Sequence, residues 1–152
     1  AKAHLRLGDA LTQAQEYDSA VSHYRKALEI SPQYAVAAAN LLVPLRALGR
    51  IQEAIETGER ARSLLQEENP VLLYNLAVAY QDVGNMIRFL DCISYSLKLD
   101  PGNARAHVQL GRYYLQHSSD RELARRHLEE ALRLDPNLAD AALLQKTLRG
   151  SR

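Results

Sequence analysis

The chain is poor in the features on which several classes of function depend. Cys92 is the only cysteine among the 152 residues, so no disulfide can form within the chain. Lys and Arg number 19 against 18 Asp and Glu, which gives a formal net charge of +1. Such a chain has no strong field that would attract nucleic acid or an anionic membrane. No apolar run is long enough to span a bilayer and no signal peptide is visible, so we expect no nucleic-acid partner and no membrane insertion.

Residues that commonly carry catalysis or bind metals are also few and unfavourably spaced. Cys92 has no histidine near it in sequence, and we interpret it as a small packing residue. No glycine loop of the phosphate-binding type is present. The histidines lack the three- or four-residue spacing that places two metal ligands on one helix face; they are His4, His23, His107, His117 and His127. We therefore expect no cofactor, no metal site and no catalytic residues, and the chain is not predicted to be an enzyme.

What the sequence does contain is an internal repeat. The stretch from Val71 to Pro101 has the pattern of two short helices joined by a turn at Gly84 and Asn85. Apolar residues recur three and four positions apart on both sides of that turn, which is the spacing of one helix face. The same pattern recurs along the chain, and a fixed period carries more weight than any local assignment. No strand, low-complexity segment or linker is predicted.

Four units of this kind follow one another, at residues 1–34, 35–69, 70–103 and 104–138, and a further helix is predicted at 139–150. Glycine and alanine at two of the shared positions have a physical role, because two helices approach closely only where side chains are small. The first and fourth units share most positions, which pair His4 with His107, Leu7 with Leu110, Gly8 with Gly111, Leu11 with Tyr114, Ala20 with Ala124, Tyr24 with Leu128, Ala27 with Ala131 and Pro32 with Pro136.

The second unit departs from this pattern. Leu42 stands where the first unit has the small Gly8, and Gly58 stands where it has the large Tyr24. Our hypothesis is that Leu42 occupies the volume that Gly58 leaves free, so that a larger residue at position 58 would overpack the core. Pro44 falls inside the first helix of this unit, where a proline costs about 3 kcal/mol, and we expect a local kink there.

The spacing resembles that of the tetratricopeptide repeat, whose signature has a large residue, Leu-Gly, Tyr, a small residue with a following aromatic, and Pro. This resemblance covers the whole chain. It implies an all-α fold: a right-handed α-solenoid of four helix hairpins with a C-terminal capping helix, forming one domain over residues 1–152. His4 and His107 occupy a position at which the family often has Trp, so the resemblance implies that they pack between helices.

The last helix has the pattern of a solenoid cap. Its apolar stripe consists of Ala141, Leu144 and Leu148. Polar residues stand where the repeat would need apolar ones for a following helix, which keeps the last element of a solenoid soluble; they are Gln145, Lys146 and Arg149.

In the family that the chain resembles, the first helix of each pair lines a concave surface. Asn40, Asn75 and Gln109 are equivalent across three units, and an amide can hydrogen-bond the backbone of an extended peptide whatever its side chains. This row is similar to the asparagine ladder of O-linked N-acetylglucosamine transferase, although Arg6 interrupts it in the first unit. The predicted peptide-binding residues are Asn40, Val43, Tyr74, Asn75, Val78, Arg105, Val108, Gln109 and Arg112.

This surface has two other interpretations. Plain solvation stays open, and a carboxylate clamp is disfavoured. Plain solvation of a helix face would also place amides there. A clamp for the C-terminal carboxylate of heat-shock chaperones, known from co-chaperones of this family, is disfavoured, because Asn40 alone fits in one register and Asn75 alone fits one unit further along. Arg105 and Arg112 would nevertheless favour an acidic ligand.

The predicted function is that of a protein-interaction scaffold that holds an extended peptide of a partner in its concave groove. One alternative is that the chain is the substrate-recruiting arm of a larger enzyme, suggested by its start at Ala1 rather than Met. The other is self-assembly into a homo-oligomer, since the first unit has no visible N-terminal cap and its exposed end would dock on another copy.

Overall fold

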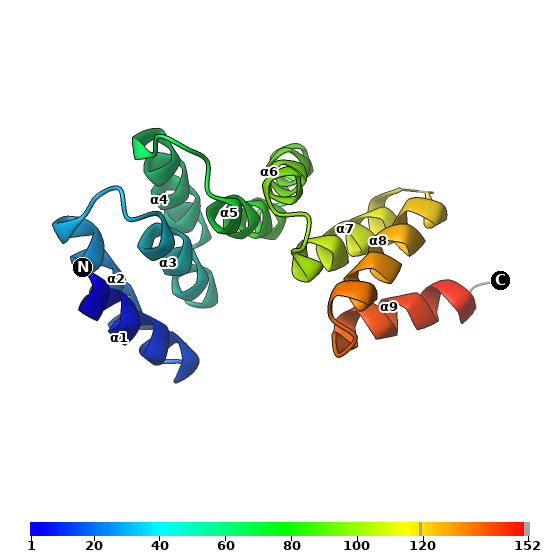
Figure 1. Ribbon diagram of the computed structural model, residues 1–152, viewed down its shortest axis with the longest axis horizontal. Helices are drawn as coiled ribbons and strands as arrows, with labels where there is room; N and C mark the ends of the chain where they lie inside the picture. Colours follow the sequence, from blue (N-terminus) through cyan, green and yellow to red (C-terminus); the bar gives the residue numbers. More distant parts are fainter. Residues whose placement is uncertain (119, 151–152) are drawn as a thin grey trace. The chain divides into compact units, whose positions relative to one another are not determined.

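The computed structural model describes the backbone of residues 1–118 and 120–150, and side chains within these ranges up to Lys146. The described residues form α-helices and no strand, which confirms the prediction of an all-α fold (Figure 1). None of these helices combines the length and the apolar character that crossing a bilayer requires. In chain order the helices are α1 (Lys2–Gln13), α2 (Tyr17–Ile30), α3 (Ala35–Ala47), α4 (Ile51–Leu64), α5 (Pro70–Asp82), α6 (Met86–Leu99), α7 (Ala104–His117), α8 (Arg121–Leu134) and α9 (Ala139–Gly150).

The chain divides into two compact units. Unit 1 spans Ala1–Leu99 and contains α1 to α6, and unit 2 spans Asp100–Arg152 and contains α7 to α9. Each unit is described by itself. That residues 1–152 act as one domain stays a prediction.

Tight reversals join the paired helices of unit 1. The chain turns with a positive φ at Gln15 (62°), Gly49 (74°) and Gly84 (76°), one such residue after each of α1, α3 and α5. A left-handed residue commonly ends a helix because it lets the last carbonyls find partners, and glycine adopts it without strain. The first helices of the three pairs, α1, α3 and α5, also adjoin one another, so unit 1 is a stack of hairpins (Figure 1).

Small residues mark the closest helix contacts, as the sequence predicts. A Cβ added at Gly8 would lie 2.6 Å from the ring of Tyr24, and one added at Gly111 would lie 2.7 Å from Leu128. A Cβ at Gly58 would lie 2.5 Å from Leu76 and 3.1 Å from Leu42. Leu42 therefore does fill the space beside Gly58, together with a leucine of the next hairpin.

Helix α3 continues through Pro44 to Ala47, and the proline ring is buried. The amide of Leu48 donates to the carbonyl of Pro44 at 3.0 Å, so the helical pattern resumes directly after the ring. Burial of an apolar ring offsets part of the hydrogen bond that a proline removes.

The core of unit 2 joins all three of its helices. Val108, Leu128, Ala131 and Ala141 are buried together. Leu144 packs against this cluster from α9, which agrees with the apolar stripe expected of a capping helix. Further leucines complete the cluster; they are Leu115, Leu132 and Leu138. Gln145 is half-buried and Lys146 exposed, whereas the side chains of Leu148 and Arg149 lie outside the described residues.

Candidate functional site

Polar contacts fix the relative register of α1, α3 and α5. The Nδ2 of Asn40 donates to Oδ1 of Asp9 at 2.8 Å, which ties α3 to α1. One hairpin further, Nδ2 of Asn75 donates to the carbonyl of Ala39 at 2.8 Å. The Nε of Arg46 donates to Oδ2 of Asp82 at 2.7 Å and joins α3 to α5 near their C-terminal ends. These ties hold the three helices side by side and present their exposed residues on one face.

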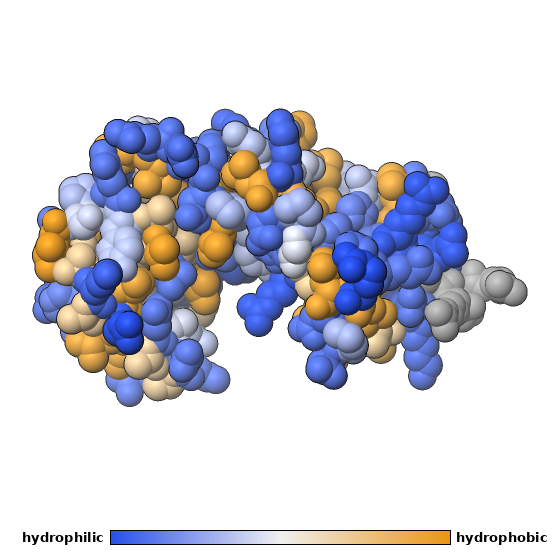
Figure 2. Space-filling view, viewed as in Figure 1, coloured by the Kyte–Doolittle hydropathy of each residue, from blue (hydrophilic) through white to orange (hydrophobic). Residues whose placement is uncertain are grey.

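We call this surface of unit 1 the α1–α3–α5 face. Its apolar residues are Val36 (46% exposed), Val43 (37%) and Val71 (47%), with Tyr74 half-buried beside them. Residues seven apart, such as Val36 and Val43, lie on the same side of a helix. Figure 2 shows hydrophobic residues lying among hydrophilic ones over α1 to α4 on the side seen there.

The predicted amide row does not consist of free amides. Asn75 is 7% exposed and donates one N–H to the carbonyl of Ala39, while Asn40 is half-buried and donates one N–H to Asp9. Each of these amides retains its oxygen as an acceptor. Val78 is also 7% exposed and lies at the base of the face rather than on it. Sequence equivalence placed these residues on the correct helices but could not reveal how deeply each one is buried.

Asp9 of α1 is not among the predicted binding residues, yet it connects this surface to the helices beneath it. Its Oδ1 accepts from the hydroxyl of Tyr24 and from Nδ2 of Asn40, both at 2.8 Å. Thr12 lies 3.2 Å from the same hydroxyl. Burial and the Asp9 carboxylate raise the pKa of Tyr24 above its ordinary value. One carboxylate thus joins α1, α2 and α3.

The other four predicted residues lie on α7 in unit 2. Arg105 is exposed, and Arg112 forms an ion pair with Asp140 of α9 at 3.3 Å. Val108 is 5% exposed and belongs to the core of unit 2. Gln109 is half-buried, and its Oε1 is buried without a hydrogen bond from any described residue. A buried acceptor of this kind gains free energy from any donor that reaches it.

The histidines form two equivalent pairs. The Nδ1 atoms of His4 and His23 are 2.9 Å apart, and those of His107 and His127 are also 2.9 Å apart. Tyr114 stacks on His127 with ring centroids 5.7 Å apart. The partners are 19 and 20 residues apart in sequence, so no spacing rule for one helix could reveal them.

The described residues hold no group of three or more side chains placed to bind a metal ion. Cys92 is 4% exposed, and burial raises the pKa of its thiol to about 11. A thiol of this kind is almost entirely protonated at neutral pH and is a poor nucleophile.

Two segments of the chain, residues 1–34 and 104–138, match family models of the tetratricopeptide repeat. They coincide with the first and fourth predicted units. Comparison with the curated proteins gives no match. The family models and the solved structures of tetratricopeptide repeat proteins that resemble the chain agree, and together they support a tetratricopeptide repeat family for the chain.

Many solved structures have a similar fold. PilF of Pseudomonas aeruginosa is 26% identical, with a TM-score of 0.83 over 97% of this chain and 66% of its own. A thermophilic tetratricopeptide repeat protein of Thermus thermophilus is 23% identical, with a TM-score of 0.81 over 97% of this chain and 80% of its own. YrrB, a tetratricopeptide repeat protein with an unusual peptide-binding site, is 21% identical, with a TM-score of 0.69 over 95% and 74%.

These likenesses establish an all-α helical-repeat solenoid as the fold class. Tetratricopeptide repeat proteins are typically non-enzymatic scaffolds that bind protein partners. The chain is accordingly a protein–protein interaction scaffold.

Proposed function

We propose that the α1–α3–α5 face of unit 1 binds an extended segment of a partner protein, without catalysis and without nucleic acid. The observation that carries this proposal is the set of exposed valines, Val36, Val43 and Val71, on one face. Exposed apolar residues that share a face typically mark an interaction surface. The inter-helix ties from Asn40, Asn75 and Arg46 keep that face rigid, which lowers the entropic cost of binding.

The predicted residues of unit 1 act at this face, and those of unit 2 act within that unit. Val43 and Tyr74 contact apolar side chains of the partner, and Val78 supports them from below. Asn40 and Asn75 accept backbone N–H groups through their oxygens, because one N–H of each amide is already bound within the chain. On unit 2, Arg105 and Arg112 attract an acidic segment and Gln109 accepts a hydrogen bond through its unpaired oxygen. Val108 acts indirectly, because it anchors α7 in the core of unit 2.

The proposal is tested with substitutions that keep the fold. Peptides selected from a random displayed library against the chain are titrated by calorimetry into the wild type and into Val43→Lys/Val71→Lys. Both valines are exposed, so the lysines do not disturb the core. Loss of even one valine contact, worth about 1.5 kcal/mol, corresponds to about tenfold weaker binding.

Val83→Lys is the matched control, because Val83 is 49% exposed, close to the 47% of Val71, and lies outside the face. Control affinity equal to the wild type, with the double variant weakened at least about tenfold, is the expected result. Equal affinity of the double variant and the wild type would exclude the α1–α3–α5 face.

A second candidate function, self-association, is favoured by one observation on α1. Leu7 is 49% exposed, whereas the equivalent Leu41, Leu76 and Leu110 are 2%, 0% and 4% exposed under neighbouring helices. A second copy of the chain offers helices of the same kind to cover Leu7. Light scattering over a concentration series tests this. A wild-type mass that rises with concentration, and a Leu7→Glu variant that stays monomeric, are expected; a wild type that stays monomeric throughout contradicts self-association.

A further inference from the structure

One side of α1 carries an exposed apolar stripe. It consists of Ala3, Leu7, Ala10 and Ala14, and their spacing of four, three and four residues places them on one side of the helix. The residues at the positions of Ala3 and Leu7 in α3, α5 and α7 are all buried; they are Ala37, Leu41, Leu72, Leu76, Ala106 and Leu110. The stripe is therefore the packing side of α1, and no described helix covers it.

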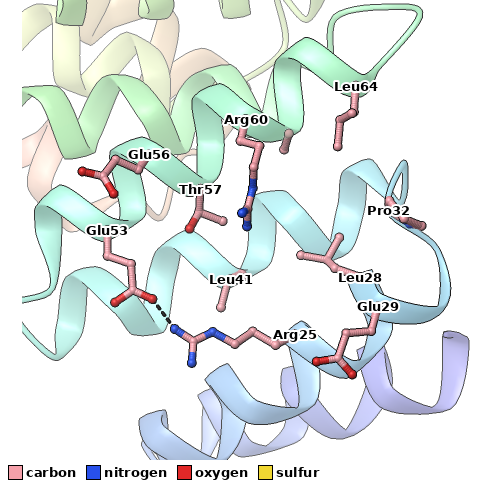
Figure 3. A pocket seen from close by; sticks show the side chains of 11 residues that line it. Arg25, Leu28, Glu29, Pro32, Leu41, Glu53, Glu56, Thr57, Arg60 and Leu64 are labelled. Carbon is pink, nitrogen blue, oxygen red and sulfur yellow. Dashed lines mark hydrogen bonds and ion pairs between the residues drawn. The ribbon is translucent and has the colours of Figure 1, made fainter.

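Leu41, the residue of α3 equivalent to Leu7, shows what covers this side of a helix in the next hairpin. It is 2% exposed and lies at the hollow between α2 and α4, which has a volume of about 710 Å³ (Figure 3). Leu28 of α2 and Leu64 of α4 line the same hollow. Apolar side chains of neighbouring helices thus accompany Leu41, whereas Leu7 would gain free energy from any apolar surface that removed it from water.

The spacing of the stripe is the same from either end of α1. If two copies of α1 lie antiparallel about a two-fold axis, Leu7 of each copy lies opposite Ala10 of the other, and Ala3 lies opposite Ala14. A large side chain then meets a small one, and the alanines at both ends let the two helix axes approach closely. In a parallel pair the two copies of Leu7 would instead lie opposite each other.

The charges beside the stripe favour the same antiparallel arrangement. Lys2 is exposed in the first turn of α1, where the helix dipole disfavours a cation, and Glu16 is exposed just after the end of α1. Neither side chain has an ion-pair partner among the described residues. In an antiparallel pair Lys2 of each copy lies beside Glu16 and the negative helix end of the other copy, so both charges gain a partner.

We propose that two copies of the chain associate through α1, antiparallel and about a two-fold axis. Leu7 of each copy packs over Ala10 of the second copy, and Lys2 pairs with Glu16 at both ends of the interface. This proposal rests on the self-association described above and adds its surface and its register. An interface of this symmetry closes on itself, so the product is a dimer and not a filament.

Charge reversal tests the predicted register. Sedimentation equilibrium of the full chain gives the dimer dissociation constant of the wild type, of Lys2→Glu, of Glu16→Lys and of the variant that carries both substitutions. Each single variant places like charges together at both ends of the interface and should associate about three- to tenfold more weakly. The double variant restores opposite charges and should associate within about twofold of the wild type.

Lys26→Glu is the matched control, because Lys26 is exposed on α2 and has no ion-pair partner among the described residues. It makes the same change in net charge as Lys2→Glu and should leave the dissociation constant unchanged. Weakening by the control equal to that by Lys2→Glu would show an effect of net charge alone and would reject the pairing of Lys2 with Glu16.

Cross-linking tests the direction of the two helices. Chains with Ala3→Cys and chains with Ala14→Cys, one of them carrying a mass tag, are oxidised alone and as a mixture. The antiparallel pair predicts disulfides chiefly between the two variants in the mixture, and few in either variant alone. Cys92 is 4% exposed, so the wild type should give no cross-link.

The outcomes separate this proposal from self-association itself. A wild type that stays monomeric at every concentration would overturn both. A wild type that dimerises while the double charge reversal fails to restore association, or while Ala3→Cys cross-links chiefly with itself, would overturn the antiparallel α1 pair and leave self-association standing.

Discussion

Gly58 of α4 faces two leucines, one from its own hairpin and one from the next. A side chain there would meet Leu76 at 2.5 Å and Leu42 at 3.1 Å. Leu42 and Leu76 are both fully buried, so neither can move aside into solvent. The sequence indicated the exchange of volume between positions 42 and 58. It could not indicate Leu76, because that contact depends on how closely the next hairpin stacks.

Gly58→Ala is expected to lower the free energy of unfolding by about 1–3 kcal/mol, the range for an overpacked core. Urea unfolding followed by circular dichroism measures it. Gly102→Ala is the control, since the added carbon meets only Asp100, at 3.4 Å, in an exposed turn. A Gly58→Ala variant as stable as the control would show that the two leucines do not enclose position 58.

His127 couples the stability of unit 2 to pH. Burial and the neighbouring His107 lower the pKa of His127 below its ordinary value. The groups around the pair are Tyr114, stacked on His127, the carbonyl of Pro101, 3.3 Å from His107 Nε2, and Glu130. If the Nδ1 atoms of His107 and His127 both carried a proton, two N–H groups would point at each other across the 2.9 Å contact.

The direction of this pH dependence follows from proton binding to the folded and the unfolded chain. As the pH falls through about 6.5, the unfolded chain takes up a proton on His127 that the folded chain still refuses. The free energy of unfolding is therefore highest above that pH and decreases as the pH falls toward the lowered pKa. Urea unfolding at a series of pH values should show this for the wild type, with a weaker dependence in His127→Gln. Parallel curves for the two proteins would exclude His127 as the source, and Gln116→Ala, at an exposed position, should parallel the wild type.

At the scale of the helix, the apolar spacing was sufficient to predict each element. Residues three and four apart form a stripe only on a helix, and that stripe recurs in every hairpin. The orientation of the amides was not predictable in the same way. Asn75 reaches the carbonyl of Ala39 because α5 lies directly against α3, and no local property of α5 encodes that distance.

Asp9 shows how one side chain can hold three helices. Asp9→Ala removes the acceptor of Tyr24, which is 1% exposed, and of Asn40. The loss should be on the order of 2–3 kcal/mol, since hydrogen bonds to a charged group are the strong ones and the buried hydroxyl loses its acceptor. Asp91→Ala, at an exposed position of α6, should change stability by less than about 0.5 kcal/mol.

A double-mutant cycle with Tyr24→Phe tests the tie directly. Phenylalanine has no hydroxyl to leave unpaired, so Asp9→Ala should cost less in the Tyr24→Phe background than in the wild type. Additive effects in chemical denaturation would mean that Asp9 and Tyr24 act independently.

At the scale of the whole chain, equivalent residues have different surroundings. Leu7, Leu41, Leu76 and Leu110 occupy one repeat position, yet their exposed fractions are 49%, 2%, 0% and 4%. A repeat pattern predicts that each leucine lies on the packing side of its helix. It does not determine whether another helix covers that side, because the covering helix belongs to the neighbouring hairpin.

A comparison of Leu7→Ala with Leu41→Ala measures how this difference in exposure affects the free energy of unfolding. Leu41→Ala leaves a cavity in the core and should cost about 2–5 kcal/mol. Leu7→Ala removes a half-exposed side chain and should cost less than about 1 kcal/mol in dilute solution. If a second copy covers α1, the cost of Leu7→Ala should rise with protein concentration, because self-association stabilises the wild type by mass action. A Leu7→Ala variant that is as unstable as Leu41→Ala at every concentration would show that Leu7 is already packed within the single chain.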